Sequence, residues 1–216
     1  MKIIVVGIGK VGFTVADQLS NEMHDVILID TNEKVLNAVL NHLDVIAVHG
    51  NGASRKVLSE AGVEESDLVI ALTGSDEINL LCCLLATKLG ANGTIARVRN
   101  HVYYEDVRLI KDSLGLSMVI NPEKEAAEEI LRILKYPSAK NIDTFAKGKI
   151  NIVSFTATKN CTLCGQTVKD SFSGLKARAL ACAVERENKI FIPFGDSVIE
   201  ENDVVAVLAQ RNPDIF

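Results

Sequence analysis

The chain has 216 residues, of which 48% are hydrophobic and 24% charged, so it is long enough for one large or two small globular domains. Its formal net charge of −5 provides no basic field that could neutralise the phosphates of a nucleic acid, and we expect no nucleic-acid partner. The apolar runs are far shorter than the roughly 18 residues of a membrane-spanning helix. Five cysteines, an odd number, do not suggest a disulfide framework. These features predict a cytoplasmic protein.

Residues 2–134 repeat one cycle: a short β-branched apolar run, a polar or glycine turn, and a longer stretch with helical spacing of apolar residues. The apolar runs are continuous rather than alternating, which is typical of parallel strands buried on both faces of a sheet. Repetition of this unit predicts an α/β fold, a doubly wound parallel-sheet domain of Rossmann type. The expected strands are 3–6, 26–29, 45–48, 68–72, 94–98 and 118–120, and the expected helices 11–20, 33–41, 54–61, 77–89, 104–114 and 122–134.

The cycle ends at Tyr136-Pro137, after which the pattern changes. The pattern after this point predicts a small α+β domain with antiparallel strands. It consists of two strand-like runs, a short helix at 168–175 and a final run VVAVLAQ. Polar turns are expected at Glu187-Asn188-Lys189 and at 200–203. The predicted organisation is a Rossmann-type domain with its terminal helix at 1–136, a linker at 137–148 and the small domain at 149–216.

The clearest chemical signal is Gly7-Ile8-Gly9-Lys10-Val11-Gly12, which follows a strand and opens a helix. In this context Gly7 permits a tight turn, Gly9 lets the backbone approach a pyrophosphate, and Gly12 lets the helix pack closely on the strand. The helix start also presents free N–H groups to phosphate oxygens. Lys10 has two interpretations, a mobile cation for phosphate or a solvated lysine at a helix start.

Asp30 ends the second strand 18 residues after Gly12, where an acidic side chain is expected to accept hydrogen bonds from ribose hydroxyls. A carboxylate at this position repels a 2′-phosphate, so NADP is disfavoured relative to NAD(H) or ATP/ADP. Asp30 does not distinguish NAD from ATP. The alternative is a Rossmann-like domain whose glycines serve only the turn.

Further candidates follow other strands at the same edge of the sheet, where ligands of doubly wound folds bind. Thr73 and Gly74 come after the fourth strand, and Ser75 or the next residue is expected to cap the following helix. Asn51 follows the third strand. Arg97 ends the fifth strand, where it could contact a phosphate or a ribose or serve as a partnered structural arginine.

We find no set of residues that predicts catalysis or metal binding. Cys161-Thr162-Leu163-Cys164 has metal or redox spacing but no second cysteine pair and no nearby histidine, so we expect an ordinary turn before Gly165. Cys82 and Cys83 lie in an apolar helix and are expected in the core. The four histidines are scattered, and no Ser-His-Asp or Cys-His arrangement is present.

Taken in order with the glycine motif and Asp30, the segments TGSDEIN, IARVRN and NPEKEAAEEI resemble the RCK family, the regulators of potassium conductance, and within it the TrkA/KtrA-type cytosolic subunits of potassium uptake systems. LCGQTVKDSF and IPFGDSVIEENDVV are similar to the family's small C-terminal domain. The resemblance implies a ring that binds NAD(H) or ATP/ADP, assembles as a homodimer or higher oligomer, and docks on a membrane potassium transporter or channel subunit at the inner face of the membrane.

The resemblance also implies roles for individual residues. Many members carry Arg where this chain has Lys10, and Asp where it has Asn51. Some TrkA-type proteins repeat the two-domain unit in tandem, and this chain has the length of one half. The nucleotide contacts carried over are Gly7, Ile8, Gly9, Lys10 and Val11 on the pyrophosphate, Asp30 on the ribose, Thr73 and Gly74 beside the ligand, and Arg97.

The leading hypothesis is therefore a non-enzymatic regulatory subunit in which nucleotide exchange gates a potassium pathway. A first alternative is an NAD-dependent oxidoreductase with unrecognised catalytic residues, because Rossmann domains commonly serve dehydrogenases. A second is a gating-ring scaffold without nucleotide that senses an ion through acids such as Asp76 and Glu77.

Overall fold

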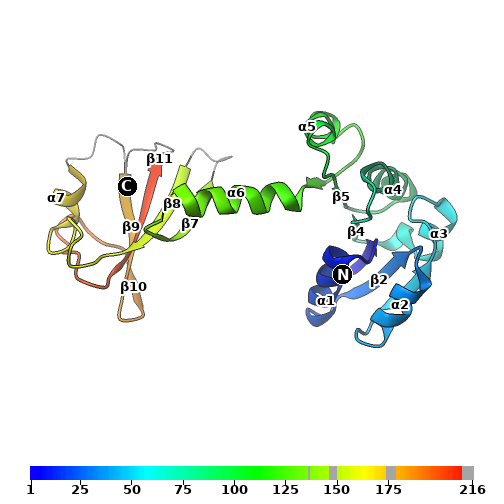
Figure 1. Cartoon of the computed structure of the whole chain (residues 1–216), viewed down its shortest axis with the longest axis horizontal. Helices are drawn as coiled ribbons and strands as arrows, with labels where there is room; N and C mark the ends of the chain where they lie inside the picture. The colour runs from blue at the N-terminus through cyan, green and yellow to red at the C-terminus, as the bar shows by residue number, and fades with distance from the viewer. Residues whose placement is uncertain (136, 146–149, 174–178, 211–216) are drawn as a thin grey trace. The chain divides into compact units, whose positions relative to one another are not determined.

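The computed structural model describes residues 1–135, 137–145, 150–173 and 179–210 of the chain. Its contacts define two compact units, Met1–Ala126 and Ala127–Phe216 (Figure 1). Each unit has a sheet and hydrophobic clusters of its own. Over the residues given above, no helix combines the length and apolar character that crossing a bilayer requires.

The first unit is built on a six-stranded sheet in which all neighbouring strands are parallel. Its strands are β1 (Lys2–Val6), β2 (Asp25–Asp30), β3 (Ile46–His49), β4 (Leu68–Ala71), β5 (Thr94–Arg97) and β6 (Met118–Ile120). The strand order β3-β2-β1-β4-β5-β6 reverses direction between β1 and β4. This topology is that of a doubly wound Rossmann-type sheet, and it confirms the predicted fold class.

Helices cover both faces of this sheet, because successive residues of a strand point to opposite sides. The helices are α1 (Lys10–Asn21), α2 (Glu33–Leu40), α3 (Arg55–Glu60), the 3-10 turn η1 (Val63–Glu65), α4 (Asp76–Leu89) and α5 (His101–Ile110). A further helix, α6 (Pro122–Lys135), begins in this unit and continues past its limit at Ala126. Ile4 and Val6 of β1 belong to one cluster with residues of α3, α4 and α5. Ile3 and Val5 belong to a second cluster with residues of α1 and α2. Burial on both faces explains the continuous apolar runs.

Side chains at helix starts explain why two of these helices begin where they do. Asn32 precedes α2, and its side-chain oxygen accepts hydrogen bonds from two N–H groups of the first turn. Ser75 caps α4 by accepting from the Ile78 N–H, as the sequence predicts. α1 differs, because Gly9 precedes it and provides no side-chain cap. The first N–H groups of α1 thus have no intrahelical partner and are free to meet a ligand.

The second unit contains an antiparallel sheet in the order β10-β9-β11-β8-β7. Its strands are β7 (Ala139–Phe145), β8 (Ile150–Thr156), β9 (Ala179–Arg186), β10 (Lys189–Phe191) and β11 (Val204–Gln210), and its helix is α7 (Val168–Ser173). Glu187 and Asn188 join β9 to β10 with φ angles of 50° and 62°. Two successive positive φ angles are typical of a type I′ hairpin turn. The predicted α+β domain and its hairpin turn are confirmed.

The predicted linker at 137–148 contains a strand, which corrects that part of the sequence analysis. Ala139–Phe145 forms β7 and pairs antiparallel with β8. This edge strand buries only Ile142, so it lacks the alternation of apolar residues by which a strand is recognised. The two units separate after Ala126, inside α6, whereas the sequence-based limit is residue 136. Positions 136 and 146–148 lie outside the described residues.

An ion pair connects Arg186 at the end of β9 to Asp203, the residue before β11, and these two strands are paired. Arg186 donates from Nε to Asp203 Oδ1 at 2.8 Å and from Nη2 to Asp203 Oδ2 at 2.7 Å. Asp203 is 1% exposed and also accepts from the Glu200 N–H at 2.8 Å. Burial raises the pKa of the Asp203 carboxyl, but the bonds from Arg186 and the Glu200 backbone outweigh it and hold this pKa below its ordinary value. The charged carboxylate therefore stabilises the fold.

We predict that Asp203→Asn lowers the free energy of unfolding by about 2 kcal/mol at neutral pH, because it removes charged hydrogen bonds from a buried site. A lowered pKa in the folded state means that this stabilisation is present above the unfolded pKa of about 3.9 and is lost as pH falls through the folded value. Thermal unfolding at neutral pH and at about pH 3 should show the difference from wild type shrinking on acidification. Glu201→Gln is the control, because Glu201 is exposed and pairs with Lys159 only at 3.6 Å. Equal effects of the two changes would contradict the prediction.

Candidate functional site

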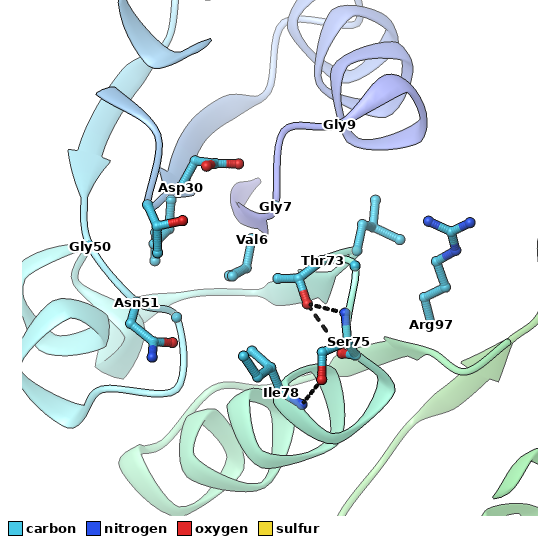
Figure 2. Close-up of a pocket in the computed structure, with 15 residues that line it drawn as sticks. Val6, Gly7, Gly9, Asp30, Gly50, Asn51, Thr73, Ser75, Ile78 and Arg97 are labelled. Carbon is cyan, nitrogen blue, oxygen red and sulfur yellow. Dashed lines mark hydrogen bonds between the residues drawn. The ribbon is translucent and has the colours of Figure 1, made fainter. Parts of the chain in front are cut away.

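A pocket of about 410 Å³ opens in the first unit at the carboxyl ends of the parallel strands. It lies beside β1 and β4, where the strand order reverses, which is the place where doubly wound sheets bind ligands. Figure 2 shows Asp30 and Asn51 on one side of the pocket and Arg97 on the other. The lining residues are Val6, Gly7, Gly9, Ile29, Asp30, Thr31, Gly50, Asn51, Gly52, Leu72, Thr73, Gly74, Ser75, Ile78 and Arg97.

The three glycines of the loop between β1 and α1 have different steric environments. Gly7 has a φ of +90°, which strains any residue with a side chain, and a Cβ there would lie 2.7 Å from the Thr73 backbone. A Cβ on Gly12 would lie 2.0 Å from the Gly7 carbonyl oxygen. At Gly9, by contrast, a Cβ would meet nothing within 4 Å. The fold therefore requires Gly7 and Gly12, whereas Gly9 leaves space on the pocket side.

Asp30 holds the glycine loop in addition to lining the pocket. Its Oδ2 accepts from the Ile8 N–H at 2.7 Å, and its Oδ1 accepts from the Asn32 N–H at 2.8 Å. A carboxylate offers about four acceptor positions, so these two bonds leave capacity for ribose hydroxyls. The ribose contact of Asp30 stays a prediction, and the sequence analysis did not predict the bond to Ile8. Asp30 thus couples the end of β2 to the loop after β1.

Asn79 is a site residue that the sequence analysis missed. It lies in the first turns of α4, is 0% exposed, and its Oδ1 accepts from both the N–H and the hydroxyl of Thr73, at 2.8 and 2.7 Å. Its Nδ2 donates to the Arg97 carbonyl at 2.9 Å. One amide side chain therefore holds together the ends of β4 and β5 beside the pocket. A polar residue in the otherwise apolar helix segment INLLCCLLA was the available signal.

Arg97 contributes a cation whose Nε is a buried donor without a partner among the described residues. Its side chain is 13% exposed, and its Nη2 donates to Glu123 Oε1 in the first turn of α6. Burial raises the pKa of the Glu123 carboxyl, but its own backbone N–H and Arg97 outweigh burial and lower it. Within the described parts of the chain, Arg97 Nε is buried without a hydrogen-bond partner. A buried donor of this kind calls for an explanation such as an absent water or ligand.

Asn51 sits in a short loop after β3 that closes the pocket on the side of Asp30. Its Oδ1 accepts from the Ala53 N–H at 2.9 Å, which fixes the loop by a local turn. The next residue, Gly52, is buried, and a Cβ there would lie 2.2 Å from Val6 Cγ1. The loop therefore packs directly against the end of β1.

The structure brings seven of the predicted site residues to the pocket, namely Gly7, Gly9, Asp30, Asn51, Thr73, Gly74 and Arg97. The other four do not line it. Ile8 and Val11 pack in the cluster under α1 and α2, and Gly12 lies against Gly7. Lys10 is exposed at the first position of α1, in agreement with either of its two interpretations.

The acids named for ion sensing take part in local hydrogen bonds. Asp76 is 7% exposed, and its Oδ2 accepts from the N–H groups of Arg99 and Asn100, at 3.0 and 2.8 Å. Glu77 accepts from the Ser75 hydroxyl at 2.6 Å, and this bond lowers the pKa of Glu77. Asp76 thus holds the loop after β5, and Glu77 supports the start of α4.

Sequence comparison connects this architecture to known proteins. The pattern of the TrkA-N domain matches residues 3–122, and that of the TrkA-C domain matches residues 152–213. The chain belongs to the TrkA family. These matches confirm the family that the sequence resembles, in both of its domains.

Curated relatives of this family match over nearly the whole chain. The Trk system potassium uptake protein TrkA homolog of Archaeoglobus fulgidus is 35% identical over 210 residues, covering 97% of this chain and 47% of the relative. The Trk system potassium uptake protein TrkA of Halomonas elongata is 34% identical over 216 residues, covering 98% of this chain and 47% of the relative. The chain spans about half the length of these relatives.

Solved structures share the fold. The match to the GsuK channel covers 98% of this chain and 38% of the channel chain, with a TM-score of 0.63 and 20% identity. The match to the GsuK channel bound to NAD covers the same shares, with a TM-score of 0.59 and 19% identity. The match to the TrkA-N domain of the Escherichia coli inner membrane protein YbaL has a TM-score of 0.55 and 22% identity, and it covers 62% of this chain and 96% of that domain. At these identities the similarity concerns the fold.

The glycine environments predict different effects for the same substitution at two positions. Alanine in a helix is ordinarily about 1 kcal/mol more favourable than glycine, yet Gly12→Ala should lower the free energy of unfolding by about 2 kcal/mol because of the clash with Gly7. Gly9→Ala should cost only about 0.5 kcal/mol, since alanine is a poorer residue than glycine before a helix start. It should weaken the binding of a nucleotide, the ligand class expected from the sequence, because its methyl group occupies the pocket side of the loop. Chemical unfolding and calorimetry measure the two effects. Comparable destabilisation by both changes, or wild-type affinity in Gly9→Ala, would refute this account.

Proposed function

We propose that this chain is a non-enzymatic, nucleotide-binding regulatory subunit that gates a membrane potassium uptake transporter or channel. The observation that carries the proposal is the pocket at the strand-order reversal, where an uncapped helix start, Gly9 and Asp30 lie together. An uncapped helix start attracts phosphate oxygens, and the carboxylate of Asp30 has acceptor capacity for ribose hydroxyls. One pocket thus offers groups that suit both the phosphates and the ribose of a nucleotide.

The proposed ligand is NAD(H) or ATP/ADP. The pyrophosphate would lie over Gly7 and Gly9, and the ribose would hydrogen-bond to Asp30. NADP is disfavoured, because its 2′-phosphate would approach that carboxylate. At the opposite end of the pocket, the buried Arg97 Nε would donate a hydrogen bond to a further acceptor atom of the ligand. The NAD named for the GsuK channel structure agrees with this ligand class.

Regulation rather than catalysis is supported by the lining of the pocket. Among the described lining residues, Asp30 and Arg97 carry the ionisable side chains, and Asp30 already accepts two backbone hydrogen bonds. Among the lining residues that the structure describes, we find no acid–base or nucleophile pair that would act on a nicotinamide or a phosphate. Arg97 pairs with Glu123, so a ligand that contacts Arg97 would act on the first turn of α6. A nucleotide that binds two conformations unequally shifts their populations.

The proposed partner protein is inferred from the names of relatives in the TrkA family. Relatives named as Trk system potassium uptake proteins support a membrane transporter or channel subunit as the protein that the chain regulates. The proposed location is the cytoplasm, with peripheral association at the inner face of the membrane. The proposed assembly is a homodimer or a higher ring, because a gating ring transmits change through contacts between copies.

Calorimetry with NADH, NAD, ATP, ADP and NADP tests the proposal. We expect binding of at least one nucleotide that lacks a 2′-phosphate, and weaker binding of NADP than of NAD. Asp30→Asn should weaken binding at least about tenfold, because it removes the charge that accepts from ribose and from Ile8.

Asp25→Asn is the matched control for that experiment. Asp25 is an exposed acid on the same strand, but it begins β2, at the opposite end from Asp30. This variant should bind with wild-type affinity. Thermal unfolding of both variants shows whether the Asp30 loop persists. Absence of binding by all five nucleotides at millimolar concentration, or equal losses in the two variants, would overturn the proposal.

A further inference from the structure

One turn of the second unit holds two cysteines that are unrelated to the nucleotide pocket. The Cys164 N–H donates to the Cys161 carbonyl at 3.1 Å. This bond closes a four-residue turn, whose first and fourth Cα atoms lie within about 7 Å of each other. A disulfide requires Cα atoms about 4.4–6.8 Å apart. The backbone of this turn therefore brings the Cα atoms of the two cysteines to a separation compatible with a disulfide.

Hydrogen bonds on both sides hold the turn in place. The Cys161 N–H donates to the Thr158 carbonyl at 2.9 Å. After the turn, the Gly165 N–H donates to the Ile199 carbonyl at 2.8 Å, and Gly165 has a φ of +81°. Cys161 also packs against the hydrophobic cluster of this unit. The cysteines are thus kept close together in the reduced protein, which favours reaction between them over reaction with separate partners.

Their exposure distinguishes these cysteines from two others in the chain. Cys161 and Cys164 are partly exposed, whereas Cys82 and Cys83 are buried in the first unit. Burial raises the pKa of the Cys82 thiol to about 12, which suppresses the reactive thiolate. Cys182 is partly exposed as well, but it lies in β9 and donates to the Ala206 carbonyl at 3.2 Å. Cys161 and Cys164 are therefore the pair with both access and proximity.

Metal binding is a less suitable use of this pair. Structural zinc takes four ligands, and two thiolates fill only half of that set. Throughout the described ranges, no group of three or more His, Cys, Asp or Glu side chains could hold a metal ion. Thiol–disulfide exchange, in contrast, needs only two thiols and an oxidant.

We propose that Cys161 and Cys164 form a redox-active dithiol that a low-molecular-weight disulfide oxidises. One thiolate attacks a sulfur of that disulfide, forms a mixed disulfide and displaces one thiolate. The second cysteine, as its thiolate, attacks the protein sulfur of the mixed disulfide and displaces the other. The protein loses two electrons and two protons, and the oxidant is reduced to two thiols. Oxidation would lock the turn without requiring the nucleotide site.

Oxidation of the reduced full chain with glutathione disulfide tests this proposal. After acid quenching and denaturation, wild type should have lost two of its five thiols, and the peptide that holds Cys161 and Cys164 should be lighter by two hydrogens. The Cys182→Ser variant is the control and should form the same disulfide. In Cys164→Ser, closure is impossible, and a glutathione adduct should accumulate on Cys161.

Three results would overturn the proposal. The first is wild type that retains all of its thiols. The second is persistence of glutathione adducts on Cys161 and Cys164 without closure, which would show that the turn keeps the sulfurs apart. The third is stoichiometric zinc in the purified chain that Cys161→Ser abolishes, which would assign the pair to a metal. None of these results bears on nucleotide binding.

Discussion

The contact between the loop after β1 and the end of β4 is the constraint on which the first unit depends. Gly7 adopts a positive φ and leaves no room for a Cβ beside Thr73, and Gly12 lies against the Gly7 carbonyl. This close packing sets the direction in which α1 leaves the sheet. It also places the uncapped start of α1 over the point where the strand order reverses. The space that a ligand would occupy is thus created by the same contact that organises the fold.

Two polar side chains, the half-buried Asp30 and the buried Asn79, hold this arrangement together around the pocket. Asp30 connects β2 to the glycine loop, and Asn79 connects the ends of β4 and β5. Each hydrogen-bonds to backbone groups that lie near the pocket, so the loops are positioned before any ligand arrives. A prearranged site lowers the ordering cost of binding. Arg97 differs, because its Nε has no partner among the described residues and its guanidinium also reaches Glu123 on α6.

Sequence reasoning predicted the features that leave local signatures. The strand, glycine motif and helix around Gly7 repeat a pattern with a known steric cause, and Asp30 stands at the expected distance from it. Strand β7 left no such signature, because an edge strand that buries one side chain, Ile142, shows no alternation. Asn79 was missed because its importance arises from Thr73 and Arg97, which approach it only in the folded chain. Long-range hydrogen bonds of this kind are invisible to a search for local patterns.

The most direct test of the account is hydrogen–deuterium exchange of the full chain with and without a saturating nucleotide from the calorimetric set. Exchange reports the opening of individual backbone hydrogen bonds and the protection of N–H groups by a ligand. We expect slower exchange in the glycine loop and first turn of α1, residues 7–13, and in residues 73–75, with smaller changes elsewhere in the first unit. Unchanged exchange at residues 7–13 in the presence of bound nucleotide would contradict it, because the ligand would then lie at another place on the molecule.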